Sequence, residues 1–304
     1  MSRIPRELIK HLEWHAGQEV PVIEQPAPAP TPTSNTGKFS IDAILSGKTF
    51  FSDIKNSEGL YVGVSAALRE ATKYSGAEGI VVSTPELIAA KIKAEKTHDF
   101  WQKWYTVHTE ENIDIDKKGS LVKKGKPVLL VVHGGGLLTP GRIDQAYTEG
   151  LINSSARYTE KEFDDLLIGK LPNGKSIRIC TIDEIKKGVS NLPHQFGVVM
   201  SYRIAEATKS DYHNKKDFME NPLVIARAGG IENLEKYFEK AKNSSGNVGN
   251  WHVYAGRDPS QVQGRLLFLN LYNGLDGNYL LNSIGRFVGV AAPEAPVGAP
   301  RVGV

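Results

Sequence analysis

The stretch KPVLLVVHGGGLLTPGRIDQAY, residues 126–147, decides our prediction of the fold. Val128 to Val132 form a continuous apolar run with the length of one strand. A run without polar alternation is typical of a strand buried on both faces, as in a parallel sheet covered by helices. Three glycines follow, and Thr139-Pro140 then supplies a helix N-cap and a first helical residue. The stretch predicts a buried strand, a glycine loop and a helix.

A second stretch, GIVVSTPELIAAKIKAEK at residues 79–96, has the same order. Ile80 to Val82 predict a short buried strand, and Ser83 or Thr84 precedes a proline as the N-cap of a helix. Two such units predict the α/β class, with a parallel sheet core and covering helices. The α+β class stays open, because the second half of the chain is richer in predicted strands and less regular.

The residues between the two units predict a long helix over about 85–107. Its aromatic segment FWQKWY, residues 100–105, has the spacing of a stripe that faces the core. The next segment, VHTEEN at residues 107–112, is charged, and we interpret it as a solvated helix end.

The two ends of the chain differ in composition from its middle. We predict an N-terminal helical arm at 1–20, a Pro-rich linker at 21–38, a globular α/β body at 39–290 and a flexible tail at 291–304. Alternating prolines in the linker favour an extended polyproline-like chain. A short helix on such a linker predicts a docking arm, and hence a protein partner or self-association through the termini.

Composition limits the function classes. The chain has 304 residues, a net charge of +3 and one cysteine, Cys180. One cysteine excludes an internal disulfide and a cysteine zinc cluster. No apolar run approaches the ~18 residues of a membrane span, and no secretory signal is evident, so we expect a cytoplasmic protein without a membrane partner. The small charge gives little support for nucleic acid, although the lysines of residues 117–126 leave that partner open. The scattered histidines predict no metal site, and we expect no cofactor.

One segment, GKLPNGKS at residues 169–176, matches the spacing of a nucleotide-binding phosphate loop. Such a loop needs a strand before it and a helix after it. Here Thr159 and Glu162 form a capping box for a preceding helix, and the alternation of SIRICTI, residues 176–182, predicts a following strand. The segment therefore predicts a helix end and a tight turn.

The most informative local feature is the glycine loop after the first buried strand. VLLVVHGGG, residues 128–136, resembles the oxyanion loop of a lipase and esterase family within the α/β-hydrolases. The resemblance implies a later serine in a G-x-S-x-G turn, and none follows; the nearest substitute is Ser65, which precedes the loop. More generally, glycine amides at the end of a strand can bind an anion. The ligand-binding residues that we predict are His133, Gly134, Gly135, Gly136, Thr139, Arg142, Ser83 and Thr84.

These observations leave two functions. The first is a non-catalytic intracellular interaction or assembly protein that docks through its termini. The alternative is a small-molecule hydrolase or anion-binding enzyme with its site at the His-Gly-Gly-Gly loop. The catalytic residues of that alternative are unknown, and the sequence does not decide whether the chain is an enzyme.

Overall fold

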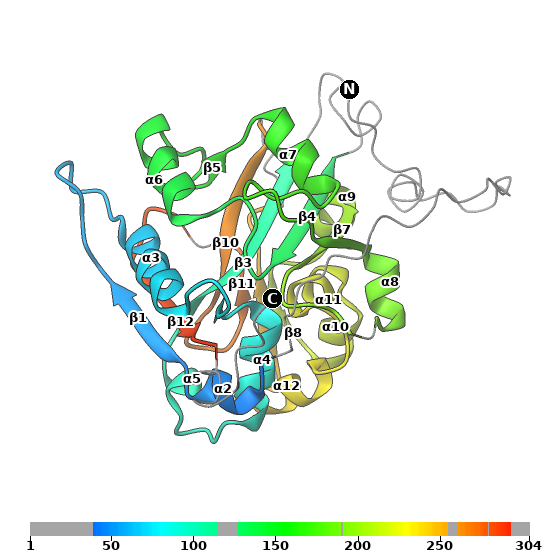
Figure 1. The fold of residues 1–304 in the computed structure, drawn as a ribbon. Coiled ribbons are helices and arrows are strands. Elements are labelled where there is room, and N and C mark those ends of the chain that lie inside the picture. Colours follow the sequence, from blue (N-terminus) through cyan, green and yellow to red (C-terminus); the bar gives the residue numbers. More distant parts are fainter. Residues whose placement is uncertain (1–38, 115–126, 190, 255–260, 279, 293–304) are drawn as a thin grey trace, which may run out of the picture.

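The computed structural model describes residues 39–114, 127–189, 191–254, 261–278 and 280–292. The predicted arm at 1–20, the linker at 21–38 and the lysine segment at 117–126 lie outside these ranges, as does all of the predicted tail except 291 and 292. The described residues contain both helices and strands in an α+β arrangement (Figure 1).

The helices are α2 (Ile41–Leu45), α3 (Gly63–Ser75), α4 (Thr84–Lys93), α5 (Asp99–Gln102), α6 (Pro140–Glu149), α7 (Glu160–Leu167), α8 (Ile182–Lys187), α9 (Tyr202–Glu206), α10 (Lys215–Glu220), α11 (Pro222–Ala228) and α12 (Leu234–Ala241). The strands are β1 (Lys48–Ser52), β2 (Ile80–Val81), β3 (Tyr105–Asp114), β4 (Val128–His133), β5 (Ala156–Arg157), β6 (Arg178–Thr181), β7 (Phe196–Ser201), β8 (Asp211–His213), β9 (Val248–Trp251), β10 (Gln263–Leu269), β11 (Leu275–Asp276) and β12 (Gly285–Val290).

The strands form two sheets, and neither has the predicted parallel core. The small sheet has the order β1-β12-β2, and both of its pairs are antiparallel. The large sheet has the order β6-β7-β4-β3-β10-β11-β9-β8, with β5 paired to β10. Within it only β6–β7 and β11–β9 are parallel among the described pairs. The parallel prediction was wrong because a continuous apolar run reports burial of both faces and does not report strand direction.

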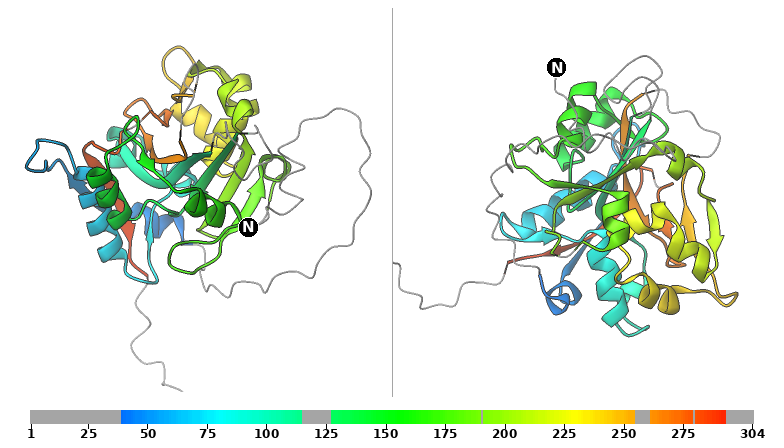
Figure 2. Two further views of the ribbon diagram at one scale, coloured as in Figure 1. Left: turned by 90° about the horizontal axis from the view of Figure 1, so that it is seen from above. Right: turned by 90° about the vertical axis from the view of Figure 1, so that its right-hand side faces the viewer.

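Strand β4 is fully buried and separates two hydrophobic cores. Leu129 and Val131 pack in one core with α4, α11 and α12. Val128, Leu130 and Val132 point the other way and pack with α3, α6 and α7. This alternation follows from the two-residue period of a strand. Helices therefore cover both faces of the sheet beside β4 (Figure 2).

Strand β3 was not predicted from the sequence, because it contains charged residues although nearly all of it is buried. The predicted helix over 85–107 ends at Lys93 instead, and after the short α5 the chain enters β3 at Tyr105. The segment VHTEEN lies inside this strand, so its interpretation as a solvated helix end was wrong. Glu110 and Glu111 are both fully buried. Charged residues are seldom buried without partners, so two adjacent glutamates did not indicate a buried strand.

Glu111 is neutralised from one side of the sheet by Arg227 of α11. The guanidinium donates from Nε to Oε1 at 2.6 Å and from a second nitrogen to Oε2 at 3.0 Å. It also donates to Asn250 Oδ1 and to the carbonyls of Trp251 and Leu275. Burial alone raises the pKa of Glu111, but Arg227 holds it below its ordinary value. One side chain of α11 thus connects β3, β9 and β11.

The local sequence signals were more accurate than the sheet prediction. Ser83 caps α4 with a capping box to Glu86, and Thr139 caps α6. Helix α7 has the predicted capping box, and the segment 169–176 is a turn with Gly169 at φ 79° before β6. The interpretation of that segment as helix, turn and strand is confirmed. In the described part of the chain, no helix is long and apolar enough to cross a membrane.

The ion pair of Glu111 and Arg227 gives a first prediction. Arg227→Met should lower the free energy of unfolding by roughly 3–5 kcal/mol, because it leaves a buried carboxylate without its partner. Chemical denaturation measures the loss. The double variant Glu111→Gln/Arg227→Met should recover part of it, since no charge is then buried; a double variant less stable than the single one would contradict this account.

Candidate functional site

The glycine loop turns tightly over a buried histidine at the end of β4. Gly134 and Gly135 have φ of 73° and 93°, a region that favours glycine. A Cβ on Gly135 would lie 2.3 Å from Cε1 of His108. The amide of Gly135 donates to the carbonyl of His108 at 3.1 Å. Two glycines are therefore required here by backbone conformation and by contact with β3.

Of the glycine amides that we predicted to face an anionic ligand, that of Gly136 faces an internal carboxylate, together with the next two amides of the loop. Glu110 Oε1 accepts hydrogen bonds from the amides of Gly136 at 2.7 Å and Leu138 at 2.9 Å. Its Oε2 accepts from Leu137 N at 3.0 Å. Converging backbone amides are a good anion site in general. In this chain β3 itself supplies the carboxylate.

Among the described residues, Glu110 has no cation of the kind that Glu111 has in Arg227. Burial raises the pKa of Glu110 to about 7, although its hydrogen bonds from Leu138, Gly136 and Leu137 oppose the shift. The hydroxyl of Tyr158 is buried near this carboxylate and has no hydrogen-bond partner among the described residues. The loop therefore encloses a carboxyl group that titrates near neutral pH.

His133 is fully buried, and both of its ring nitrogens are engaged. Nε2 donates to the carbonyl of Ala226 at 2.9 Å, and Nδ1 lies 3.2 Å from Thr109 Oγ1. Burial lowers its pKa to about 4, so the ring is neutral at physiological pH. This histidine connects β4 to α11 and β3.

Ser83 and Thr84 come close to the loop, but they too are buried. Thr84 N donates to Thr109 Oγ1 at 2.9 Å, the same oxygen that contacts His133. Ser83 Oγ donates to Glu86 Oε2 at 2.9 Å, and His194 Nδ1 lies 2.5 Å from the other oxygen of that carboxylate. Both side chains bind one carboxylate, so the histidine does not receive the serine proton, as nucleophilic catalysis would require.

The two residues predicted on α6 have structural partners. Thr139 Oγ1 accepts from Arg142 N at 3.2 Å as the N-cap. The guanidinium of Arg142 binds Glu162 at 3.0 Å and Glu149 at 3.4 Å. Ser65, the substitute nucleophile, lies inside α3 and donates to Pro140 O and Asp144 Oδ1. The structure thus gathers most of the predicted residues at one end of β4, with internal partners; their role in binding a ligand stays a prediction.

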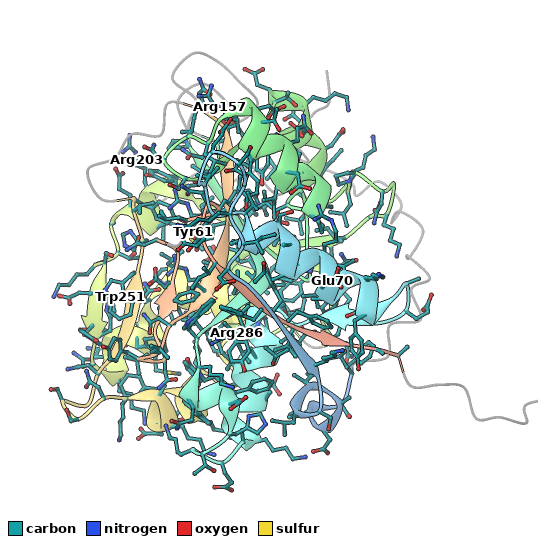
Figure 3. All side chains as sticks on the ribbon, turned by 90° about the vertical axis from the view of Figure 1, so that its left-hand side faces the viewer. Tyr61, Glu70, Arg157, Arg203, Trp251 and Arg286 are labelled. Carbon is teal, nitrogen blue, oxygen red and sulfur yellow. The ribbon has the colours of Figure 1, made fainter. Side chains whose placement is uncertain are left out.

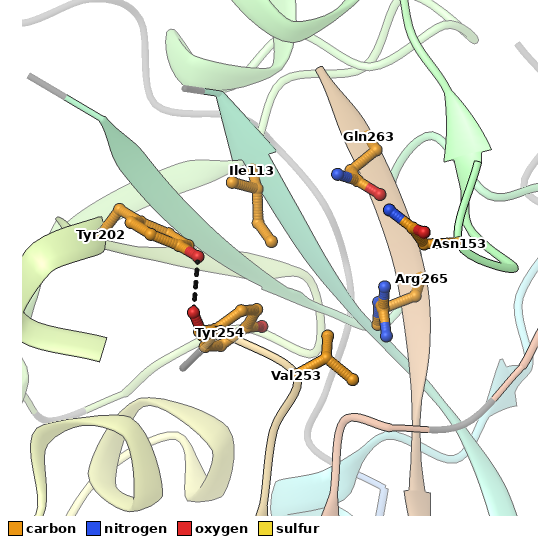
Figure 4. Close-up of a pocket in the computed structure, with 7 residues that line it drawn as sticks. All are labelled: Ile113, Asn153, Tyr202, Val253, Tyr254, Gln263 and Arg265. Atoms are coloured by element: carbon orange, nitrogen blue, oxygen red, sulfur yellow. Dashed lines mark hydrogen bonds between the residues drawn. The ribbon is translucent and has the colours of Figure 1, made fainter. Parts of the chain in front are cut away.

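A small hollow lies between the ends of β3 and β10 and the chain after β9 (Figure 4). Most of its polar groups already bind one another or nearby residues. The Tyr202 hydroxyl donates to the Tyr254 carbonyl at 3.3 Å, and Arg265 donates to Gly277 O at 3.1 Å and to Ser155 Oγ at 2.7 Å. The polar groups around the hollow therefore serve mainly to connect neighbouring segments of the chain. Its lining is Ile113, Asn153, Tyr202, Val253, Tyr254, Gln263 and Arg265.

A cluster of partly exposed aromatic side chains and one arginine lies on another side of the molecule, where the two sheets meet. We call Phe51, Trp104, Phe268 and Arg286 the aromatic seam. Phe51 of β1 lies opposite Arg286 of β12 in the small sheet. The ring centroid of Trp104 is 6.2 Å from that of Phe51 and 5.3 Å from that of Phe268 in β10. Figure 3 shows Arg286 in the lower centre of this side, below Tyr61 and to the right of Trp251.

A turn after β10 adds two exposed apolar side chains. Leu271 is 54% exposed and Tyr272 is 70% exposed. The side chain of Asn270 holds the turn by accepting from the amides of Tyr272 at 3.0 Å and Gly274 at 2.9 Å. Asn273 is fixed from below, because the buried amine of Lys91 donates to its Oδ1 at 2.8 Å. The backbone of the turn is thus held without help from its two exposed side chains.

Trp251 lies flat against β9 and the start of β11. A Cβ on Gly249 or on Gly274 would come within 1.7 or 2.0 Å of its indole. Tyr212 of β8 meets the indole edge-on, with the ring centroids 5.1 Å apart. We call the aromatic seam, Leu271, Tyr272, Tyr212 and Trp251 together the aromatic face.

The sequence did not reveal the aromatic face, because its residues come from six separate segments. Trp104 was assigned to a core-facing helical stripe with Phe100, Trp101 and Tyr105. Those three residues are indeed buried, but Trp104 is only half-buried and turns to the seam. The pairing of β1 with β12 and of β3 with β10 brings the members of the aromatic seam together, and Trp251 and Tyr212 join through β11, β9 and β8.

The close approach of Gly135 to His108 gives a second prediction. Gly135→Ala should lower the free energy of unfolding by about 2–4 kcal/mol, because a left-handed backbone strain and a clash in the core add together. Gly174→Ala is the matched control, since Gly174 has φ of 80° with nothing within 4 Å of a Cβ. Thermal unfolding compares the two, and equal losses would show that the contact with His108 is unimportant.

Glu110 gives a third prediction. Its pKa is raised from 4.5 to about 7, so the folded state holds the proton more tightly than the unfolded state does. The resulting stability is complete below about pH 4.5 and is lost as the pH rises to 7, by about 3 kcal/mol. Glu110→Gln cannot ionise, so its unfolding free energy should lack this fall. Denaturation curves from pH 4 to 8 test it, and parallel pH dependence in both proteins would contradict it.

Comparisons with known proteins place the fold but not a family. No protein-family model matches the chain, and no curated protein matches it. Among solved structures, a similar chain comes from a study of how the C-type lectin fold accommodates massive sequence variation in Nanoarchaeota. It is 29% identical, with a TM-score of 0.59, and the match covers 80% of this chain and 97% of that one. The mixed and mostly antiparallel architecture described above therefore resembles the C-type lectin fold.

Proposed function

We propose that this chain is a non-catalytic binding protein and that its partner binds the aromatic face. The single observation that carries the proposal is the cluster of aromatic side chains where the two sheets meet, with the exposed Leu271 and Tyr272 on the turn that follows β10. Exposed apolar side chains that gather on one side of a protein commonly mark an interaction site. Tyrosine, tryptophan and arginine, which form much of this face, are also the residues enriched in binding hot spots.

The similar structure supports the proposal in a second way. That chain is described as a case in which the C-type lectin fold accommodates massive sequence variation. A fold can accommodate sequence variation only at surface positions whose side chains do not stabilise it. Leu271 and Tyr272 have this character, because Asn270 and Lys91 fix their turn from outside the pair.

The alternative of a hydrolase or anion-binding enzyme has weaker support. The amide of Gly136 already binds Glu110, together with those of Leu137 and Leu138, and the amide of Gly135 binds the carbonyl of His108. Docking or self-association through residues 1–38 and 291–304 is a further part of the proposal, supported by the Pro-rich sequence of 21–38.

Selection from a display library of random heptapeptides on the immobilised full chain tests the proposal. Phe51→Ser/Tyr272→Ser should reduce binding of the enriched peptides by about tenfold or more, as loss of hot-spot side chains does. Its unfolding free energy should change by less than ~1 kcal/mol, because both side chains are largely exposed. Ile231→Ser, another exposed apolar residue between α11 and α12, is the matched control. Equal binding to all three proteins would refute the proposal.

A further inference from the structure

We infer that the aromatic face recognises an extended peptide segment in which a carboxylate lies between apolar side chains, and that Arg286 binds this carboxylate. The inference rests on the proposed function and names the class of its partner. It follows from the stacking of Arg286, from the charges around it and from the free edge of β1.

The guanidinium of Arg286 is stacked with two aromatic rings. Its central carbon is 4.5 Å from the ring centroid of Trp104 and 5.0 Å from that of Phe51. Stacking uses the faces of the guanidinium plane and leaves its N–H edge available. Within the described part of the chain, the guanidinium makes one long hydrogen bond, from one nitrogen to Trp104 O at 3.4 Å. The group is held in place, and most of its five N–H donors have no hydrogen-bond partner among the described residues, so they can bind a carboxylate in a bidentate manner.

The charge of Arg286 is not neutralised within the described residues. No carboxylate in these ranges forms an ion pair with it, and Asp99, whose pKa it helps to lower, binds Lys103 at 2.6 Å. Other arginines in the molecule do have acidic partners. The pairs are Arg69 with Asp144, Arg142 with Glu149 and Glu162, Arg203 with Glu206, and Arg227 with Glu111.

The surroundings of Arg286 favour a peptide over a nucleic acid. Phe51 is 50% exposed, and Ile54, three residues further along, is 52% exposed. Apolar neighbours of this kind exclude water from a bound ion pair and add contact area. A phosphate backbone is instead bound by several cations along its length. Lys103, the lysine that lies next to Trp104 in sequence, is already bound to Asp99.

Strand β1 offers a backbone partner for an extended chain. In the order β1-β12-β2 it is an edge strand, paired only with β12 among the described strands. Figure 1 shows it at the rim of the molecule. An extended peptide can add to such an edge through main-chain hydrogen bonds, while alternate side chains provide specificity. A peptide on this edge would lie beside Phe51, and Arg286, whose guanidinium packs against that ring, lies one strand further in, on β12.

The heptapeptides selected on the full chain provide the test, after counter-selection on Phe51→Ser/Tyr272→Ser. We expect Asp or Glu next to apolar residues in the enriched sequences. Changing that acid to its amide, or changing Arg286 to Lys, should each weaken binding by roughly tenfold, because the bidentate geometry is lost. The two changes together should weaken it no further than either one. Arg203→Lys is the matched control and should bind like the unchanged protein.

The outcomes separate this inference from the proposed function. Enriched peptides without an acidic residue, or peptides that bind Arg286→Lys unchanged, overturn the inference and leave the binding face intact. No enrichment over the Phe51→Ser/Tyr272→Ser protein overturns both. A single-stranded oligonucleotide that binds the full chain and is lost with Arg286→Lys, without any acidic peptide enriched, would assign the site to phosphate and overturn the peptide assignment.

Discussion

The structure depends on two adjacent carboxylates buried in the middle of a sheet. Glu110 and Glu111 follow each other in β3, so their side chains leave opposite faces of the strand. Neither can lie in a core without compensation. Arg227 brings α11 to Glu111, and the amides of residues 136–138 bring the glycine loop to Glu110. One pair of residues thereby fixes the elements that cover both faces of β3.

The sequence predicted those features that are set by neighbouring residues. The caps at Ser83, Thr139 and Thr159 depend on three or four consecutive positions, and each was located correctly. Strand direction depends on partners that are distant in sequence, so the apolar run of β4 could not report it. Strand β3 was missed for a different reason: the charge of Glu111 is balanced by Arg227, more than one hundred positions away, and Glu110 is bound by the amides of residues 136–138 in another element.

In the candidate site, too, features set by neighbouring residues were predicted and features set by distant residues were not. Reasoning about the glycine loop predicted an anionic ligand against its amides, which stays a prediction, and it could not foresee that β3 places the Glu110 carboxylate there. Seven of the eight predicted residues lie at that end of β4 or at the helix caps that meet it, whereas Arg142 turns toward Glu149 and Glu162. The aromatic face had no signal in any single segment. Phe51, Trp104 and Arg286 are separated by up to 235 positions and meet only through strand pairing.

In the turn at residues 270–274, the backbone conformation does not depend on the two side chains at its tip. An asparagine side chain and a buried lysine determine the path of the chain, while the two residues at the summit project outward. Under the proposed function, exchange of Leu271 and Tyr272 would change the surface offered to a partner and leave the hydrogen bonds that hold the turn intact. Such a position suits the grafting of unrelated specificities onto one unchanged framework.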